Sequence, residues 1–403
     1  MRVLHLLKTS TGAAWALRQM RELVRLGIDV HVALPPGGAL YKRYEQAGVQ
    51  THPFVCDFPT RHPWLLPNRL RGLRRLVDEV SPCLLHSHFV GTTLTMRLAL
   101  AGRPSPKRIF QVPGPLHLEQ PLARMVELNT ASDADHWIAS CQWTQNCYHS
   151  LGIPRPRVSL SYYGIDLDHF DSGTPGKLRS ELNIDPQTPI VGMVAYIYAP
   201  KWYLGHRRGI KGHEDLIEAM AILRDQGQNF HLVFAGGPWN NAAAYENRIQ
   251  RYAKRQLGDR VSFLGTRTDI PDLYQDFQLV VHPSHSENLG GAIESLSSAV
   301  PTIATRIGGF PDVVIPDKTG WLTPPKNPKI LAKVIHEALL EPTKSKRLAL
   351  AGRELCRQMF SARKTSESIS TIYETILNQD VSAETTFLTL NPTSTGQAKQ
   401  EVA

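Results

Sequence analysis

The sequence has no long apolar run, few cysteines and none of the common short motifs for binding a metal or a dinucleotide. No apolar stretch approaches the roughly 20 residues that a bilayer-spanning helix needs. The opening MRVLHLLKTST is not expected to be a secretory signal, because Lys8 interrupts its apolar stretch. The five cysteines form no C-x-x-C pair and are odd in number, which favours a reduced, cytoplasmic protein with buried thiols.

Acidic residues are outnumbered, and the chain carries a formal net charge of +9. Much of the excess lies in residues 61–75, RHPWLLPNRLRGLRR, where leucines share one helical face and arginines occupy the flank and the other face. Two interpretations stay open: contact with an anionic membrane surface, or a solvated face above an ordinary core stripe. Nucleic acid is not an expected partner, because no recognition-helix, zinc or aromatic-stacking pattern accompanies the charge.

The 403 residues suit two domains better than one core. Short apolar runs alternate with helical apolar spacing, a pattern that breaks in the Gly- and Pro-rich residues 166–189 and then restarts. This predicts two α/β domains with doubly wound, mostly parallel sheets, residues 1–175 and 176–360. Residues 379–403 are polar and aperiodic, and we expect a disordered tail there. In such sheets, ligands bind at the carboxyl ends of the strands.

The turn after the first expected strand, STGAAW, contains Gly12 and leads into a helix. Helix amides and a residue without a side chain suit a phosphate group, although a plain structural turn fits equally. The turn does not match G-x-G-x-x-G, and the second strand ends without an acidic residue. A dinucleotide site is therefore not favoured.

A second strand-end loop concentrates positive charge. The segment YIYAPKWYLGHRRGIKG contains Lys201, Arg207, Arg208 and Lys211, and the first acidic residue after it is Glu214. Fixed donors and mobile cations at a helix N-terminus are what a diphosphate requires. This loop is therefore predicted to bind an anion.

The segment HSENLGGAIES follows an expected buried strand and places two carboxylates around a glycine pair. Glu294 falls in the first turn of a helix, where stabilisation of the helix dipole is the alternative role. Glu287 precedes the helix and has no such role. Carboxylates in a cleft that holds cations can accept hydrogen bonds from sugar hydroxyls.

The stretch PSHSENLGGAIESLSSAVPTIATRIGG resembles the donor-site signature of the family 4 retaining glycosyltransferases. KGHEDLIEAM, FAGG and YYGIDLDHF occur in the order found in that family. The resemblance implies the GT-B architecture, in which two Rossmann-like domains face a central cleft. We also expect residues 361–378 to form a helix that crosses back to the first domain.

The resemblance also implies roles for residues of the second domain. Glu294 would hold the ribose of the nucleotide and Glu287 the transferred sugar, but six residues separate them where the family has seven, so Ser286 could take the place of Glu287. Lys211 would neutralise the diphosphate. The backbone amides that would face the sugar and phosphates are those of Gly290, Gly291 and Ala292.

Other implied roles lie around the cleft. His206 stands where the family has an arginine, so Lys201, Arg207 or Arg208 would replace that cation. Gly12 would lie near the phosphates. His117, in the loop QVPGPLHLEQ, would contact the donor sugar, whereas a satisfied surface histidine is the alternative.

The expected function is transfer of a sugar from a nucleotide diphosphate donor to a hydroxyl acceptor with retention at the anomeric carbon. The acceptor is expected to be a lipid-linked saccharide in polysaccharide or glycoconjugate synthesis at the inner face of the membrane. No cofactor or metal is expected, because the sequence shows no Asp-x-Asp motif or His/carboxylate pattern. A nucleotide-sugar hydrolase or epimerase and a non-catalytic nucleotide-sugar binding protein remain alternatives.

Overall fold

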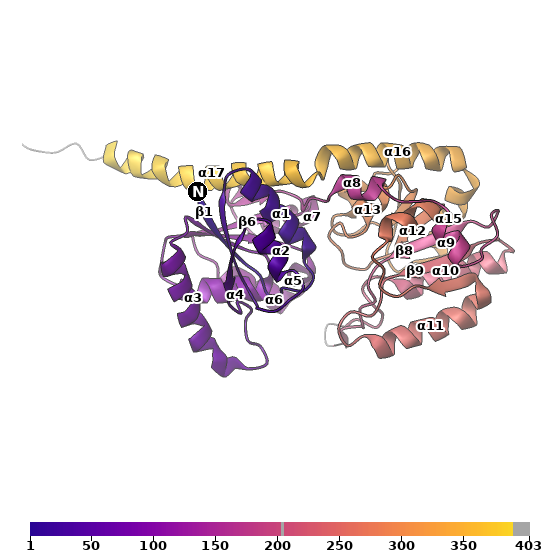
Figure 1. Ribbon diagram of the computed structural model, residues 1–403, viewed down its shortest axis with the longest axis horizontal. Coiled ribbons are helices and arrows are strands. Elements are labelled where there is room, and N and C mark those ends of the chain that lie inside the picture. Colours follow the sequence, from indigo (N-terminus) through magenta and orange to yellow (C-terminus); the bar gives the residue numbers. More distant parts are fainter. Residues whose placement is uncertain (203–204, 390–403) are drawn as a thin grey trace, which may run out of the picture.

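The computed structural model describes residues 1–202 and 205–389, with side-chain positions up to residue 378. It contains two α/β domains side by side, and two long C-terminal helices run end to end along one side of both (Figure 1). Each domain has one parallel sheet between layers of helices. The predicted fold class, two Rossmann-like domains in series, is confirmed.

The first domain has a seven-stranded parallel sheet of order β3-β2-β1-β4-β5-β6-β7. Its five inner strands have side chains that are mostly buried on both faces, as parallel strands require, whereas the edge strand β3 has no buried residue. The strands are β1 (Arg2–Leu6), β2 (Asp29–Leu34), β3 (Gln50–Pro53), β4 (Leu84–Ser87), β5 (Lys107–Gln111), β6 (Asp135–Ala139) and β7 (Val158–Leu160). The helices are α1 (Ala14–Arg25), α2 (Tyr41–Gln46), α3 (Leu66–Val80), α4 (Val90–Ala99), α5 (Leu116–Glu119), α6 (Pro121–Asn129) and α7 (Gln142–Ser150).

The second domain has a six-stranded parallel sheet of order β10-β9-β8-β11-β12-β13. The strands are β8 (Ile190–Val194), β9 (His231–Ala235), β10 (Val261–Phe263), β11 (Leu279–His282), β12 (Thr302–Thr305) and β13 (Trp321–Thr323). Its helices are α8 (Leu167–Asp171), α9 (Lys177–Glu181), α10 (His213–Asp225), α11 (Ala243–Leu257), α12 (Ile270–Asp276), α13 (Ala292–Ser297), α14 (Phe310–Val313), α15 (Pro328–Leu340) and α16 (Pro342–Met359).

The chain passes between the domains twice, and the two passages lie side by side. The Ile165 N–H donates to the Phe360 carbonyl (2.8 Å), and the Ala362 N–H donates to the Ile165 carbonyl (3.1 Å). Helix α8 follows the first passage, and its Phe170 is buried in the second domain's core. Residues 167–175, assigned from the sequence to the first domain, therefore pack with the second.

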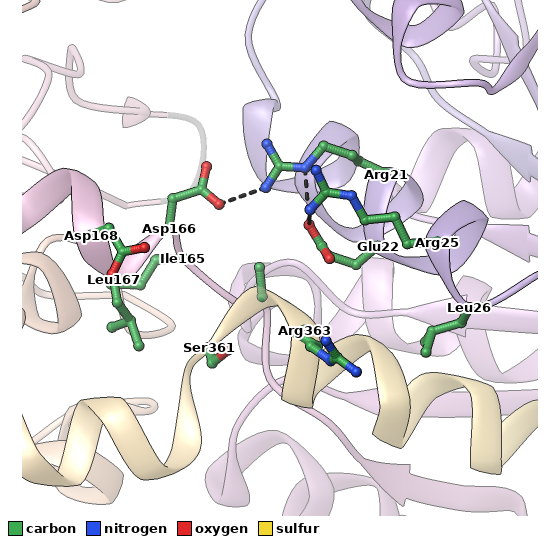
Figure 2. A pocket seen from close by; sticks show the side chains of 11 residues that line it. Arg21, Glu22, Arg25, Leu26, Ile165, Asp166, Leu167, Asp168, Ser361 and Arg363 are labelled. Carbon is green, nitrogen blue, oxygen red and sulfur yellow. Dashed lines mark hydrogen bonds and ion pairs between the residues drawn. The ribbon is translucent and has the colours of Figure 1, made fainter.

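A cavity of about 430 Å³ lies beside these passages and is lined by charged side chains of α1 and the two links (Figure 2). Arg21 Nη2 contacts Asp166 Oδ1 at 2.7 Å, which ties α1 to the first link. Arg21 and Arg25 also contact Glu22. This ion-pair group joins the first domain to the crossover.

The last helix, α17 (Ala362–Thr389), returns to the first domain and packs along α1 (Figure 1). Ile369, Tyr373 and Ile376 are buried in the first domain's core. The helix continues past the expected end at 378, so a disordered tail is wrong for residues 379–389. No proline or glycine interrupts the chain between Ala362 and Thr389, so no helix-breaking residue ends it earlier. The rest of the predicted tail, 390–403, lies outside the described residues.

The basic segment forms α3 and the turn before it. Leu73, Leu76 and Val77 face the core, while Arg71, Arg74 and Arg75 are exposed on the outside. The helix therefore has both a buried apolar stripe and an exposed basic face, so membrane contact and a solvated surface remain the two interpretations of this segment. Within residues 1–202 and 205–389, no helix combines the length and apolar character needed to cross a membrane.

Candidate active site

Five of the predicted residues line one pocket of about 330 Å³ in the second domain, which we call the strand-end pocket. The carboxyl ends of β8, β9 and β11 form its floor, and the loop before α10 and the start of α13 close it. The five residues are Lys211, Glu287, Gly290, Gly291 and Glu294. This is where ligands bind in open parallel sheets.

Lys211 is held in the strand-end pocket by its neighbour Gly212. Gly212 has φ +75°, and a Cβ there would lie 2.1 Å from the carbonyl oxygen of Pro283, so a side chain would force the loop away from the strand end. Lys211 forms an ion pair with Glu287 and lies 5.7 Å from the centre of the Tyr198 ring. Burial lowers the pKa of Lys211, but the nearby Glu287 carboxylate outweighs it and raises the pKa overall. A fixed, permanently charged ammonium results.

The structure distinguishes the two residues that compete for the first-glutamate position. Glu287 lines the strand-end pocket, and its Oε1 accepts a hydrogen bond from the Asn288 N–H at 3.1 Å. Ser286 does not line this pocket, and its hydroxyl hydrogen-bonds Glu119 of the first domain. The carboxylate next to Lys211 is thus that of Glu287.

Glu294 lies in the first turn of α13, half-buried beneath the strand-end pocket. Tyr274 donates a long hydrogen bond of 3.4 Å to its Oε2. Burial raises the pKa of Glu294, and the charges of Arg18 and Lys211 act in the opposite direction. Arg18 belongs to α1 of the first domain, so both domains contribute to the electrostatics at this carboxylate.

Three predicted cations, Lys201, Arg207 and Arg208, do not line the strand-end pocket. Arg208 donates to both oxygens of Glu218, at 2.7 and 3.1 Å, and also pairs with Asp215. These acidic partners come from α10, directly after the loop, so Arg208 anchors the loop to the helix. Arg207 lines a different cavity of about 510 Å³ behind the loop. The structure therefore corrects the prediction that these two arginines bind the donor, because neither of them lines the strand-end pocket.

Two further predicted positions lie outside the strand-end pocket. Ala292 is buried, and its N–H donates to the Leu289 carbonyl at 3.2 Å, so this amide is already used within the turn. Gly12 has φ +78° in the turn before α1, and a Cβ there would lie 3.6 Å from the ring of Trp239 in the second domain. The first-domain turn therefore closes against the second domain rather than against the pocket floor.

A larger cavity of about 930 Å³, the cleft cavity, lies between the domains. The first domain contributes Lys8, the loop of residues 113–117 and the start of α6, and the second contributes Tyr198, Lys201 and residues 286–288. Lys211 and Glu287 line both this cavity and the strand-end pocket. The two spaces are therefore adjacent, and Lys211 and Glu287 lie at their common boundary.

His117 lies on α5 at the cleft cavity. Its Nε2 hydrogen-bonds the Tyr148 hydroxyl at 3.1 Å, so it is a satisfied, buried side chain. Burial lowers the pKa of His117 to about 4. It is therefore neutral near pH 7 and suited to hydrogen bonding rather than to donating a proton.

The strand-end histidines of the first domain form a buried stack. His5 Nδ1 and His88 Nε2 are 2.9 Å apart, and His86 Nδ1 lies 2.5 Å from the Tyr373 hydroxyl of α17. One ring nitrogen from each of His5, His86 and His88 lies within 4.8 Å of the other two. The hydrogen bond to α17 gives the stack a structural role, since it fastens the returning helix to the sheet.

The sequence did not indicate some residues that the structure brings to the site. Tyr198 and Arg267 line the strand-end pocket, and Arg18 approaches it from the other domain. Arg267 is paired with Glu181 and Asp269, which fixes its position at the pocket rim. A tyrosine in the cation-rich loop was a usable signal for Tyr198, but no local pattern singles out Arg18.

Two parallel-sheet domains, with cations and carboxylates at the strand ends of the second, define the GT-B class of glycosyltransferases. Residues 13–169 match the family model described as Glycosyltransferase Family 4, and residues 202–355 match Glycosyl transferases group 1. Together these matches span most of both domains. The chain belongs to this glycosyltransferase family.

Two curated relatives share less than a third of their residues with this chain over the matched region. A D-inositol 3-phosphate glycosyltransferase of Corynebacterium glutamicum is 28% identical over 66% of this chain and 64% of its own length. The lipopolysaccharide core biosynthesis mannosyltransferase LpsB of Rhizobium meliloti is 26% identical over 56% of this chain and 62% of its own. The matched region thus spans less than two thirds of each relative.

Solved structures share the fold along nearly the whole chain. HepE of Anabaena, solved in complex with UDP, superposes with a TM-score of 0.75 at 22% identity and covers 92% of this chain and 99% of its own. Sucrose-phosphate synthase of Thermosynechococcus elongatus has a TM-score of 0.77 at 20% identity, covering 94% and 100%. At this identity the likeness extends to the fold only.

Proposed function

We propose that the protein is a retaining glycosyltransferase that moves a sugar from a nucleotide diphosphate sugar to a hydroxyl acceptor. The observation that carries the proposal is the shared wall of Lys211 and Glu287 between the strand-end pocket and the cleft cavity. A donor in the pocket would present its sugar to the cleft at this wall. HepE of Anabaena has been solved with UDP-glucose, which supports a uridine nucleotide as the first donor to test.

The residues of the strand-end pocket take separate parts in this proposal. Glu294 accepts hydrogen bonds from the ribose, Lys211 balances the diphosphate, and Glu287 orients the transferred sugar. As the sugar–phosphate bond breaks, negative charge grows on the leaving phosphate, and a fixed ammonium beside it stabilises that charge. In this proposal the Glu287 carboxylate and His117 would face the positive charge that develops on the sugar.

Retention follows in this proposal from attack on the face that the diphosphate leaves. The leaving phosphate oxygen accepts the proton of the acceptor hydroxyl, so no separate base is required. One observation supports this: burial lowers the pKa of His117 to about 4, which makes its imidazole a weak base. Metal independence is part of the proposal, because Lys211 supplies the charge that a divalent ion would otherwise provide.

The first experiment is a thermal-shift screen with UDP-, GDP-, ADP- and dTDP-sugars. A donor should raise the melting temperature by mass action, since it binds only the folded state. EDTA should leave both the shift and the activity unchanged. If no nucleotide sugar or free nucleotide produces a shift, the proposal is wrong.

Mass spectrometry of the donor incubated alone separates the rival functions. Free sugar indicates a hydrolase, an isomeric nucleotide sugar an epimerase, and unchanged donor a transferase or a binding protein. Transfer to any acceptor then excludes the binding protein. NMR of the new glycosidic bond shows whether the anomeric configuration is kept.

We also propose that the protein works at the inner face of the cell membrane on a lipid-linked saccharide during polysaccharide or glycoconjugate synthesis. The exposed arginines of α3 and the 69% exposed Trp64 before it support an anionic-membrane contact. Flotation with phosphatidylglycerol liposomes tests it. Arg71→Glu/Arg75→Glu should lose flotation, and equal flotation of both proteins contradicts the proposal.

A further inference from the structure

Helix α6 exposes its apolar face to solvent and buries its acidic residue. Its apolar residues Leu122, Met125 and Val126 occupy one face by their spacing and are 70%, 51% and 37% exposed. Its acidic residue Glu127 instead points inward and is buried. An ordinary amphipathic helix does the reverse.

The inward position of Glu127 explains why the apolar face points outward. Trp137 Nε1 donates to Glu127 Oε1 at 2.7 Å, and Arg97 Nη2 contacts the same oxygen at 3.2 Å. Both partners are themselves buried. The cost of turning α6 over would therefore include leaving a buried arginine without its carboxylate. The apolar face is held outward by this arrangement.

The exposed face of α6 continues into the cleft cavity. Pro121, Leu122 and Ala123 line that cavity, next to Leu116 and Val90 of the same domain. Three prolines, Pro113, Pro115 and Pro121, complete the wall and restrict its backbone. A rigid apolar groove thus leads from the protein surface to His117. Contiguous exposed apolar surface of this kind marks a binding site.

The same cavity carries positive charge beyond Lys211. Lys8 of the first domain and Lys201 of the second both line it. The charge of Lys8 also acts on the Asp57 carboxylate, whose pKa it lowers against the effect of burial. Burial lowers the pKa of Lys201, and the positive charge of Lys8 lowers it further. Two ammonium groups that repel each other across a cleft are complementary to an anionic group placed between them.

We propose that the acceptor is an anionic amphiphile, whose apolar chain lies in the groove along α5 and α6 and whose phosphate-bearing head lies between Lys8 and Lys201. This rests on the proposed function, because it identifies the cleft cavity as the acceptor side. The occupant is the acceptor rather than another protein, because the groove opens into the cavity that Lys211 and Glu287 line, and the hydroxyl to be glycosylated must enter there.

The test uses dodecyl phosphate below its micelle concentration as the probe, with binding followed by calorimetry. The groove variant Leu122→Ser/Met125→Ser should bind it at least about tenfold more weakly, since Leu122 lines the cavity and Met125 continues the same exposed apolar face. The matched control Leu340→Ser/Leu350→Ser changes two exposed leucines of α15 and α16 and should bind like the unmodified protein. UDP binding should be the same in all three.

A separate variant tests whether the phosphate head lies at Lys8. Lys8→Met should weaken dodecyl phosphate several-fold and leave neutral dodecyl maltoside unaffected. Equal dodecyl phosphate affinity in the groove variant and the unmodified protein overturns the proposal. So does a dimer that the groove variant alone disperses, because the groove is then an interface between copies. Loss of liposome flotation with unchanged dodecyl phosphate binding overturns it as well, in favour of membrane docking.

The outcome is distinguishable from failure of the proposed function. If dodecyl phosphate binds in the groove but no nucleotide sugar binds the strand-end pocket, the amphiphile site stands and the transferase proposal fails. If nucleotide sugars bind and react while the groove variant transfers to lipid-linked and short water-soluble acceptors equally well, only the groove inference fails.

Discussion

Lys211 and Glu287 form an ion pair in the wall between the strand-end pocket and the cleft cavity. Each therefore neutralises the other before any ligand arrives. A diphosphate that binds Lys211 must compete with this carboxylate, and Glu287 becomes available to a sugar only when that exchange has occurred. The pair connects donor binding to the positioning of the group to be transferred.

Replacing Lys211 by methionine should remove most of the affinity for a nucleoside diphosphate. A charge-assisted hydrogen bond contributes about 1.5–3 kcal/mol, so the dissociation constant should rise roughly tenfold to a hundredfold. Calorimetry with UDP and GDP measures it. Lys333→Met, on the exposed face of α15, is the matched control and should bind normally. Equal affinities in the two variants would falsify the assignment of Lys211.

Glu287→Gln should separate binding from transfer. The amide keeps the shape of the side chain but releases Lys211, so a nucleoside diphosphate should bind about as well as before or a few-fold more tightly. Transfer should fall by roughly tenfold or more, because a carboxylate no longer faces the developing positive charge. Loss of diphosphate binding together with unchanged transfer per bound donor would contradict this role.

The buried cluster behind α6 should be important for stability. Arg97 contacts Asp135 at 2.9 Å and Glu127 at 3.2 Å, and all three side chains are almost fully buried. Glu127→Ala leaves the arginine charge partly uncompensated and should lower the free energy of unfolding by about 3–5 kcal/mol. Urea unfolding measures the change. Glu79→Ala, exposed on α3, should stay within about 0.5 kcal/mol of the unmodified protein.

Stability should fall as the pH decreases from about 6.5 to 4. Burial lowers the pKa of His117 to about 4 and those of His5, His213 and His282 to about 3. In the unfolded chain these imidazoles take up protons near pH 6.5, whereas in the folded protein they stay neutral. Unfolding therefore takes up protons in this window, and above it the groups contribute no pH dependence.

Each such histidine adds a slope of up to about 1.4 kcal/mol per pH unit. Urea unfolding at several pH values between 4.5 and 7.5 measures the total. His282→Asn keeps a polar partner for Ser295, whose hydroxyl lies 3.1 Å from His282 Nε2, and should reduce the slope by about one proton. A free energy of unfolding that does not change between pH 7 and 5 would show that these side chains are accessible to protons when folded.

The alternation of strands and helices could be predicted because buried parallel strands are short apolar runs in any context. The boundaries were less predictable. Residues 167–175 resemble a linker in composition, but Phe170 packs into the second domain's core. The end of α17 was placed too early because the polar residues after 378 resemble a tail, although they contain no residue that breaks a helix before Thr389.

Within the site, residues fixed by strand-end loops were predictable and residues fixed by tertiary partners were not. Lys211 and Glu294 follow directly from a Gly-bounded loop and a helix start. Arg208 looked equally suited to an anion, but Asp215 and Glu218 on the next helix take up its charge. The outward apolar face of α6 could not be predicted, because it depends on the buried partners of Glu127.

The two links between the domains have a mechanical consequence. Because the segments at Ile165 and Ser361 run side by side and hydrogen-bond each other, they act as a paired strap rather than a single tether. Two hydrogen-bonded segments of this kind bend more easily out of their common plane than within it, and they resist twisting about their long axis. Relative motion of the two domains should therefore follow one preferred axis.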